Sequence, residues 1–433
     1  MADVSQSTDF SFKELTLVLQ NGEILDIASI FDELNLYDNI FSPCLSGSIL
    51  LTDANSIAEK LKFDGQELPK IRILIDKTGE PIEALRYQKQ FVIYNMSKKS
   101  VVNLTTQRYT LYFCSEEFPL SLQKKVNQHY KAPYHEIVKK ILTDYLKVPN
   151  GKPTNGKAGI GKIQETRQEF LFDMPTLTPF DSINWISKRA IADDSANPDF
   201  LFFELQRVGY NFRSLKTMFE DPVKFLINFN PKNLNANPGS EFLSARELKI
   251  LSQYSVLENV KGGSYAGNKL LFDTYTREFR IVPEEDIHSS SVKVGKSNLP
   301  EEKNLDNKSY KEMHDSRIVA HPYFEYRKDR PYLKEQCPEN LDFLDNPEQY
   351  IYKRKPIFTN LMQRRIQLLM PGNFGLNCSQ IITLFVPKYS IKQEDEVLDK
   401  TLSGKYIIIG TRHIIRYDKH QTLLEVATDK IQS

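Results

Sequence analysis

The sequence of 433 residues predicts a β-rich α+β protein, and three observations predict this fold class. Apolar residues alternate with a period of two in short segments near both ends of the chain, as they do in half-buried strands. In the middle, over residues 118–235, the apolar period changes to that of helices. The 21 Tyr and 26 Phe residues also favour strands. We therefore expect two β regions with a smaller mixed region between them.

The first β region covers residues 9–115. Gly22 and the Asp64-Gly65 pair are expected to form turns, and residues 57–61 a helical turn. The expected strands are at residues 48–52, 71–75, 91–94 and 109–113, the last two as a hairpin.

Two helices and a hairpin are expected in the middle region. Pro133 suits the first turn of a helix, and the apolar residues after it recur at three and four positions. This stripe consists of Tyr134, Ile137, Val138, Ile141, Leu142, Tyr145 and Leu146. Thr178 is expected to cap a second helix, with Asp181 at the reciprocal position. Residues 200–215 predict a hairpin with Gly209 near its turn.

The C-terminal segment, residues 364–429, carries the strongest strand pattern. One face of a strand is expected to hold Ile407, Ile409, Thr411, His413 and Ile415. After a polar turn predicted at residues 418–421, Leu424, Val426 and Thr428 repeat the spacing, which indicates an antiparallel hairpin. Two more strands are expected, at residues 366–370 and 380–386.

Strand periodicity also returns over residues 241–275. Residues 256–260 and 269–275 are expected to be paired strands, with Gly262 and Gly263 in the turn between them. Residues 276–356 then lose all periodicity and carry charge runs and scattered aromatics. A stretch this long inside a compact domain requires an explanation.

Composition excludes several classes of protein. With 57 basic and 56 acidic residues, the net charge of +1 does not favour nucleic acid or an anionic membrane as a partner. The four cysteines are far apart, which argues against a zinc site and for reduced thiols: Cys44, Cys114, Cys337 and Cys378. The N-terminal residues resemble no signal peptide, and no apolar run reaches the roughly 18 residues that a bilayer requires. We expect a chain that is neither exported by a cleavable signal nor anchored.

A phosphate-binding spacing occurs at residues 156–162, where GKAGIGK fits the pattern GxxxxGK. The pattern also needs Ser or Thr at the next position to hold Mg²⁺, but Ile163 stands there. The segment before it is rich in Pro, Gly, Asn and Lys, which favours a solvated loop. A phosphate-handling enzyme is therefore the weaker alternative.

No other pattern of catalytic or metal-binding residues is present. His129 and His135 form no HExxH motif, and GxSxG is absent. We expect His413 to be a packed core residue and His420 to lie in the hairpin turn. The prediction is a chain that is not an enzyme, with no catalytic, cofactor-binding or metal-binding residues.

Several segments together resemble one known family. They are MPGNFGLNCSQIITLFVP, LSGKYIIIGTRHII and LLEVATD near the C-terminus, PFDSINWISKRA, FLFFE and GYNFRSL in the middle, and NVKGGSYAGNKLLFDTYTRE after them. In the first β region the matching set is Phe41, Pro43, Gly47, Asp53, Gly65 and Glu67. Over most of its length, the chain resembles the baseplate hub proteins of contractile-tailed bacteriophages.

This resemblance implies two β-barrels, the second discontinuous, flanking a small α/β domain. The implied domains are a first barrel at residues 1–117, the α/β domain at 118–236, a second barrel at 237–276 plus 352–433, and an inserted arm at 277–351. The arm would suit contact with a neighbouring subunit or protein.

The resemblance also implies a function in the baseplate of the virion tail, after assembly in the host cytoplasm. Such hubs are homotrimers that adapt the six-fold tail tube above to the three-fold central spike below. They contact other baseplate and tape-measure proteins, and they form part of a channel for tail proteins and for DNA, which passes without sequence-specific binding. Stable membrane insertion is not expected. The alternative within this fold is the hub portion of a secretion-system spike, whose chains continue into further β domains, whereas this sequence ends at Ser433.

Overall fold

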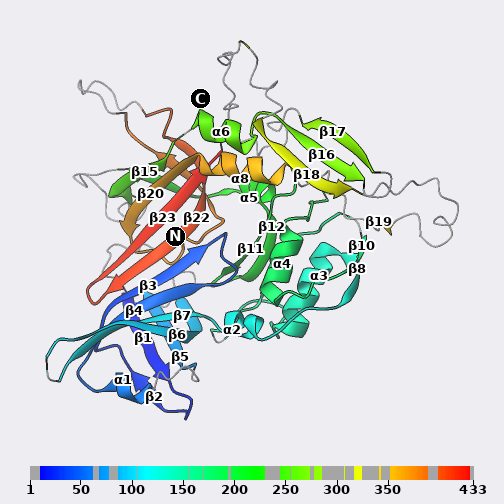
Figure 1. Cartoon of the computed structure of the whole chain (residues 1–433). Coiled ribbons are helices and arrows are strands. Elements are labelled where there is room, and N and C mark those ends of the chain that lie inside the picture. Colours follow the sequence, from blue (N-terminus) through cyan, green and yellow to red (C-terminus); the bar gives the residue numbers. More distant parts are fainter. Residues whose placement is uncertain are drawn as a thin grey trace.

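The computed structural model describes most of the chain (Figure 1). The described residues are 10–61, 68–77, 86–103, 105–154, 156–167, 169–193, 197–229, 244–253, 255–273, 277–284, 307, 316–323, 341–342, 352–388 and 398–429. The turn predicted at Asp64-Gly65, the motif residue Glu67 and Cys337 lie outside them.

The largest sheet among the described residues has fourteen strands. Its N-terminal strands are β1 (Phe10–Val18), β2 (Ile24–Asp26), β3 (Phe31–Asn39), β4 (Ser46–Asp53), β5 (Lys70–Lys77), β6 (Tyr87–Val101) and β7 (Gln107–Ser115). Its C-terminal strands are β13 (Val223–Phe229), β14 (Ser244–Ala245), β15 (Glu247–Ser252), β20 (Arg364–Pro371), β21 (Ile381–Phe385), β22 (Gly404–Arg416) and β23 (Lys419–Thr428). The strands expected in both β regions are confirmed, as is the helical turn α1 (Ile57–Lys60).

The two halves of this sheet repeat one strand order. In the first half the neighbours run β3-β4-β7-β6-β5-β1, and in the second half they run β15-β20-β23-β22-β21-β13. With the end strands β2 and β14 left out and the other six strands of each half numbered by position along the chain, both halves read second, third, sixth, fifth, fourth, first. All pairs are antiparallel in both halves except β13 with β21, which is parallel. The chain therefore contains two six-stranded units of like topology, which we call unit 1 and unit 2.

Each unit wraps a hydrophobic core. Unit 1 encloses Leu17, Ile49 and Phe91 among others, and the centroid of the Phe10 ring of β1 lies 5.9 Å from that of the His420 ring of β23. Unit 2 encloses a second core that includes Ile366 and Val426. Among the described strands the hydrogen-bonded path is open and ends at β2, β14 and β15. The structure is thus β-rich as expected, and closure of either unit into a barrel stays a prediction.

The middle region packs helices on small sheets. Its elements are α2 (Glu117–Leu122), β8 (His129–Pro133), α3 (Tyr134–Lys140), the π-helical turn η2 (Ile141–Tyr145), β9 (Ile160–Ile163), β10 (Glu169–Asp173), α4 (Pro179–Ser187), β11 (Phe200–Leu205), β12 (Gly209–Ser214) and α5 (Leu215–Glu220). The apolar stripe of α3 and η2 is buried except for Tyr145. The predicted cap of α4 is confirmed, because Thr178 Oγ1 accepts a hydrogen bond from Asp181 N and donates one to the Asp181 carboxylate.

A smaller sheet lies beside unit 2. It has the order β17-β16-β18, from β16 (Gly267–Asp273), β17 (Glu278–Glu284) and β18 (Ile318–Tyr323), and is flanked by α6 (Val256–Gly262) and α8 (Arg354–Met362) (Figure 1). The two-residue strand β19 (Leu341–Asp342) pairs instead with β10. None of the helices within the described ranges has the length and apolar character to cross a membrane.

The strand predicted at residues 256–260 is wrong. These residues form α6, because Ser255 caps the helix by accepting a hydrogen bond from Glu258 N. Gly263 ends the helix with φ of 70°, a left-handed conformation that glycine adopts without strain.

Candidate assembly junction

The two units are joined at a fork in β22. One edge of this strand pairs with β23 from Ile407 to Arg416. The other edge pairs first with β21, up to Ile407, and then with β3, from Gly410 to Ile415. At the fork, Ile408 N donates to Gln380 O at 2.9 Å and Ile40 N donates to Ile409 O at 3.0 Å. A β-bulge between Ile408 and Gly410 lets the strand bend from one unit into the other.

Polar side chains also link β22 to β3. Arg416 Nη2 lies 2.8 Å from Glu33 Oε2 on β3, and Arg412 Nε donates to Asn35 Oδ1 at 2.9 Å. The first contact lies at the surface, where Arg416 is exposed, and the second reaches the buried side chain of Asn35.

At the fork itself a buried carboxyl group meets a thiol. Cys378 donates to Asp38 both from its backbone N at 3.2 Å and from its Sγ at 2.8 Å. Burial raises the pKa of Asp38 to about 6, although the hydrogen bonds from Cys378 act in the opposite direction. The same burial raises the pKa of the Cys378 thiol, so that it stays protonated and donates.

Two histidines lie on the inner side of the junction. His413 packs in the core as predicted, with Nδ1 at 3.1 Å from Thr422 Oγ1. His420 does not lie in the hairpin turn, which is the two-residue loop at 417–418 rather than the predicted 418–421. It lies in β23 and is buried, with its ring centroid 4.3 Å from that of Phe374. A side chain at Gly372 would overlap its imidazole ring, so glycine is needed there.

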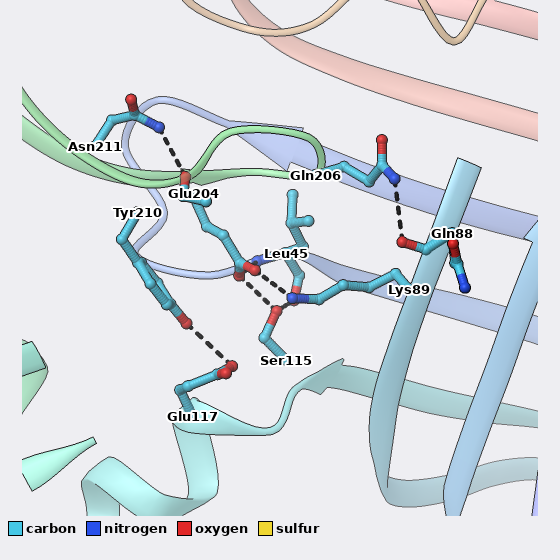
Figure 2. A network of polar contacts seen from close by, with 10 residues as sticks. Leu45, Gln88, Lys89, Ser115, Glu117, Glu204, Gln206, Tyr210 and Asn211 are labelled. Carbon is cyan, nitrogen blue, oxygen red and sulfur yellow. Dashed lines mark hydrogen bonds and ion pairs between the residues drawn. The ribbon is translucent and has the colours of Figure 1, made fainter. Parts of the chain in front are cut away.

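A second buried network joins unit 1 to the middle region (Figure 2). Glu204 of β11 forms a buried ion pair with Lys89 of β6 and accepts hydrogen bonds from Ser115 Oγ at 2.5 Å and Leu45 N at 3.1 Å. Burial alone lowers the pKa of Lys89, but the charges of Glu204 and Glu117 outweigh it and raise that pKa. Lys89 therefore stays charged inside the protein.

Around this pair the loop between β11 and β12, together with β12 itself, contributes further bonds. Gln206 Nε2 donates to Gln88 O at 3.1 Å, and Tyr210 OH donates to Glu117 Oε2 at 3.2 Å. Arg207 Nη2 donates to the carbonyl oxygens of Arg86 and Phe374 at 3.1 and 3.2 Å. The network thus holds the middle region to unit 1 and reaches the histidine pair. Nothing in the sequence pattern indicated it.

The glycine-rich segment at residues 156–162 is not the solvated loop predicted. Ala158 is buried, and β9 (Ile160–Ile163) pairs with β12. The amides that would bind a phosphate already donate elsewhere: Lys157 N to Thr154 O, Ile160 N to Pro149 O and Lys162 N to Asn211 Oδ1, at 3.0 to 3.1 Å. No helix follows β9 directly, so this segment lacks the geometry of a phosphate loop.

The remaining candidates for chemistry lie apart. His129 contacts Asp173 at 2.8 Å on the surface, and His135 contacts Thr166 at 3.2 Å. Cys44, Cys114 and Cys378 are buried free thiols. Within the part of the chain that the structure describes, no group of three or more His, Cys, Asp or Glu side chains is arranged to hold a metal ion.

No family model matches the sequence, and no curated protein matches it either. Solved structures do match. A tail protein from Neisseria meningitidis MC58 matches with a TM-score of 0.51 at 9% identity, over 98% of this chain and 97% of that chain. A 43 kDa tail protein of prophage MuSo2 from Shewanella oneidensis has a TM-score of 0.49 at 8% identity, over 96% and 97% of the two chains. A type VI secretion system component from E. coli has a TM-score of 0.43 at 9% identity, over 98% and 78%. The chain has the fold of the Neisseria tail protein, in agreement with the resemblance to tail hub proteins seen in its sequence.

Proposed function

We propose that this protein is a structural hub of a contractile-tail baseplate. Three copies would adapt a six-fold tail tube to a three-fold central spike and form part of the channel for DNA and tail proteins. The observation that carries this proposal is the repeated strand order of units 1 and 2. Three chains with two like units each present six similar positions to a six-fold ring, while the rest of the trimer keeps three-fold symmetry.

The shared fold with a tail protein over nearly the whole of both chains supports this role. In the virion the hub would contact the tube protein, the spike protein and further baseplate and tape-measure proteins. Its place would be the tail baseplate, after assembly in the host cytoplasm. DNA would pass without sequence-specific contacts, and the near-neutral net charge of +1 is compatible with that passage.

We also propose the division into a first β unit at residues 1–117, a middle α/β domain at 118–236, a second β unit at 237–276 plus 352–433, and an arm at 277–351, with two changes to these bounds, at β13 and β16. The pairing of β13 with β21 supports assigning β13 to the C-terminal unit. The pairing of β16 with β17 and β18 supports assigning β16 to the arm.

The proposed role is not enzymatic, and its test is the mass of the assembly. Light scattering on the full chain, up to high concentration, should give three times the chain mass of 50.2 kDa. A chain that stays monomeric throughout this range, or that forms dimers, contradicts the proposal.

A further inference from the structure

Unit 1 contains a fork at the same place as the fork in unit 2. In β22 the bulge falls between Ile408 and Gly410, and in β6 a bulge falls between Ile93 and Asn95. The hydrogen bond that precedes the bulge is also repeated, because Ile93 N donates to Pro69 O at 2.8 Å just as Ile408 N donates to Gln380 O. Position 93 of unit 1 therefore corresponds to position 408 of unit 2.

The two forks differ in what lies beyond the bulge. In β22, residues 410–415 pair with β3 of unit 1. In β6, residues 95–97 and 100–101 pair with β7 on one edge, with a second bulge at Lys98 and Lys99, and no described strand pairs with the other edge. A strand edge that no described strand covers is a template for another strand.

The complementary edge belongs to β15. In unit 1, β3 pairs with β4, so that Leu34 lies opposite Ile49 and Leu36 opposite Gly47. In unit 2, β15 pairs with β20 in the same register, with Leu248 and Ile250 in the corresponding places. The outer edge of β3 is covered by β22, whereas β15 pairs with β20 alone among the described strands.

Side chains at the covered edges are buried, and the corresponding side chains at the edges without a described partner are more exposed. Ile409, at the occupied fork, is 2% exposed, but its counterpart Tyr94 is 52% exposed. Leu36 of β3 is 2% exposed, but its counterpart Ile250 of β15 is 38% exposed. Large hydrophobic side chains thus occupy the corresponding positions in both units, but only the positions in the β22–β3 junction are covered by a second strand.

We propose that residues 95–101 of β6 pair antiparallel with β15 of a second copy of this chain. This inference rests on the proposed function and specifies the contact between its subunits. The new junction would repeat the β22–β3 junction in strand order, in strand direction and in register from the bulge to Ser97. Each chain has one edge of each kind, so the contact is head to tail, and in the proposed trimer three such contacts would close the ring.

The register of this contact predicts which residues face each other. Arg412 lies opposite Tyr37 at the junction within the chain. Counting from the bulge, Ser97 corresponds to Arg412, and the partner strands place Ser252 where Tyr37 stands. Ser97 of one copy and Ser252 of the next are therefore expected to be neighbours across the ring.

Cysteine cross-linking tests this pairing. In the full chain with Cys337→Ser, the double variant Ser97→Cys and Ser252→Cys should form chains linked by disulfides under mild oxidation, seen as dimers and trimers on a non-reducing gel. Each single variant, and the misaligned pair Ser97→Cys with Lys249→Cys, should give at least tenfold less linked product. The three described native cysteines are buried and serve as an internal background.

A second variant tests the edge without cysteine chemistry. Ile250→Asp should shift the light-scattering mass from trimer to monomer, whereas Ile24→Asp, at an exposed isoleucine on β2, should leave it unchanged. A trimer that forms no Ser97–Ser252 link and tolerates Ile250→Asp overturns this pairing and leaves the proposed hub role intact. A wild-type chain that stays monomeric at high concentration overturns both.

Discussion

His413 Nδ1 lies 3.2 Å from His420 Nε2, and both rings are buried against Phe374. A hydrogen bond at this contact requires one of the two nitrogens to carry no proton. Burial lowers the pKa of His413 to about 3, with the positive charge of Arg207 acting in the same direction. Burial and the neighbouring His413 lower the pKa of His420 well below its ordinary value.

The protein should therefore lose stability in mild acid. Both folded-state pKa values lie below the unfolded value of about 6.5, so stability is complete above pH 6.5 and falls as the unfolded state takes up protons. Between pH 7.5 and 5.0 each ring contributes a loss of about 2 kcal/mol in the free energy of unfolding. Urea unfolding at the two pH values measures it. His420→Gln should reduce the loss and the exposed His129→Gln should not; equal losses in all three proteins would contradict the assignment.

The ion pair between Lys89 and Glu204 should be costly to break from either side. Lys89→Met leaves the Glu204 carboxylate buried without its cation, and the expected destabilisation is about 3–5 kcal/mol. Glu204→Gln should be destabilising as well, because it leaves the lysine charge buried. Chemical denaturation gives the free energies, with Lys60→Met at the exposed Lys60–Glu23 pair as the control. Similar midpoints for the Lys89 and Lys60 variants would refute the structural role.

Gly267 makes room for Tyr352, whose hydroxyl donates to Gly263 O at 2.9 Å or to Ala266 O at 2.8 Å. A Cβ at position 267 would overlap the phenol ring, so Gly267→Ala should lower stability by about 1–3 kcal/mol. Gly262→Ala is the matched control, because its Cβ would meet its nearest neighbour at an ordinary 3.5 Å. In thermal unfolding, the melting temperature of Gly267→Ala should fall and that of Gly262→Ala should stay near the wild-type value. An unchanged melting temperature for Gly267→Ala would show that the Tyr352 ring has space to move.

The sequence predicted individual strands and helices well where one periodicity was sustained. The alternation through Ile407 and Ile409 and the stripe from Tyr134 to Leu146 each became the expected element. The turn of the last hairpin was predicted too far along the chain because His420, a polar residue, was taken for a surface residue. In the structure its ring is buried and fills the space beside Gly372. That space depends on a loop 48 residues earlier in the chain, which local pattern does not reveal.

One missed element did have a local signal. Ser255 and Glu258 form the spacing of a capping box, which predicts a helix where the apolar residues alone were taken for a strand. The forks had no such signal. The segments FVIYNM in β6 and YIIIGT in β22 carry the same bulge but share only one residue in register, Ile93 with Ile408. Their equivalence follows from hydrogen bonding between strands, which no single segment encodes.

The glycine-rich segment at residues 156–162 should bind no nucleotide, although its spacing matches a phosphate loop. Its Lys162 N already donates to Asn211 Oδ1, and Gly159 O accepts from Tyr210 N at 2.8 Å, so phosphate binding would have to break the contact of β9 with β12. Isothermal titration of the full chain with Mg-ATP should give no binding heat, both for wild type and for Lys162→Ala. Because the Lys162 side chain is exposed, this variant should also keep the unfolding free energy of the wild type. Saturable heat in the wild type that Lys162→Ala abolishes would restore the phosphate-handling alternative.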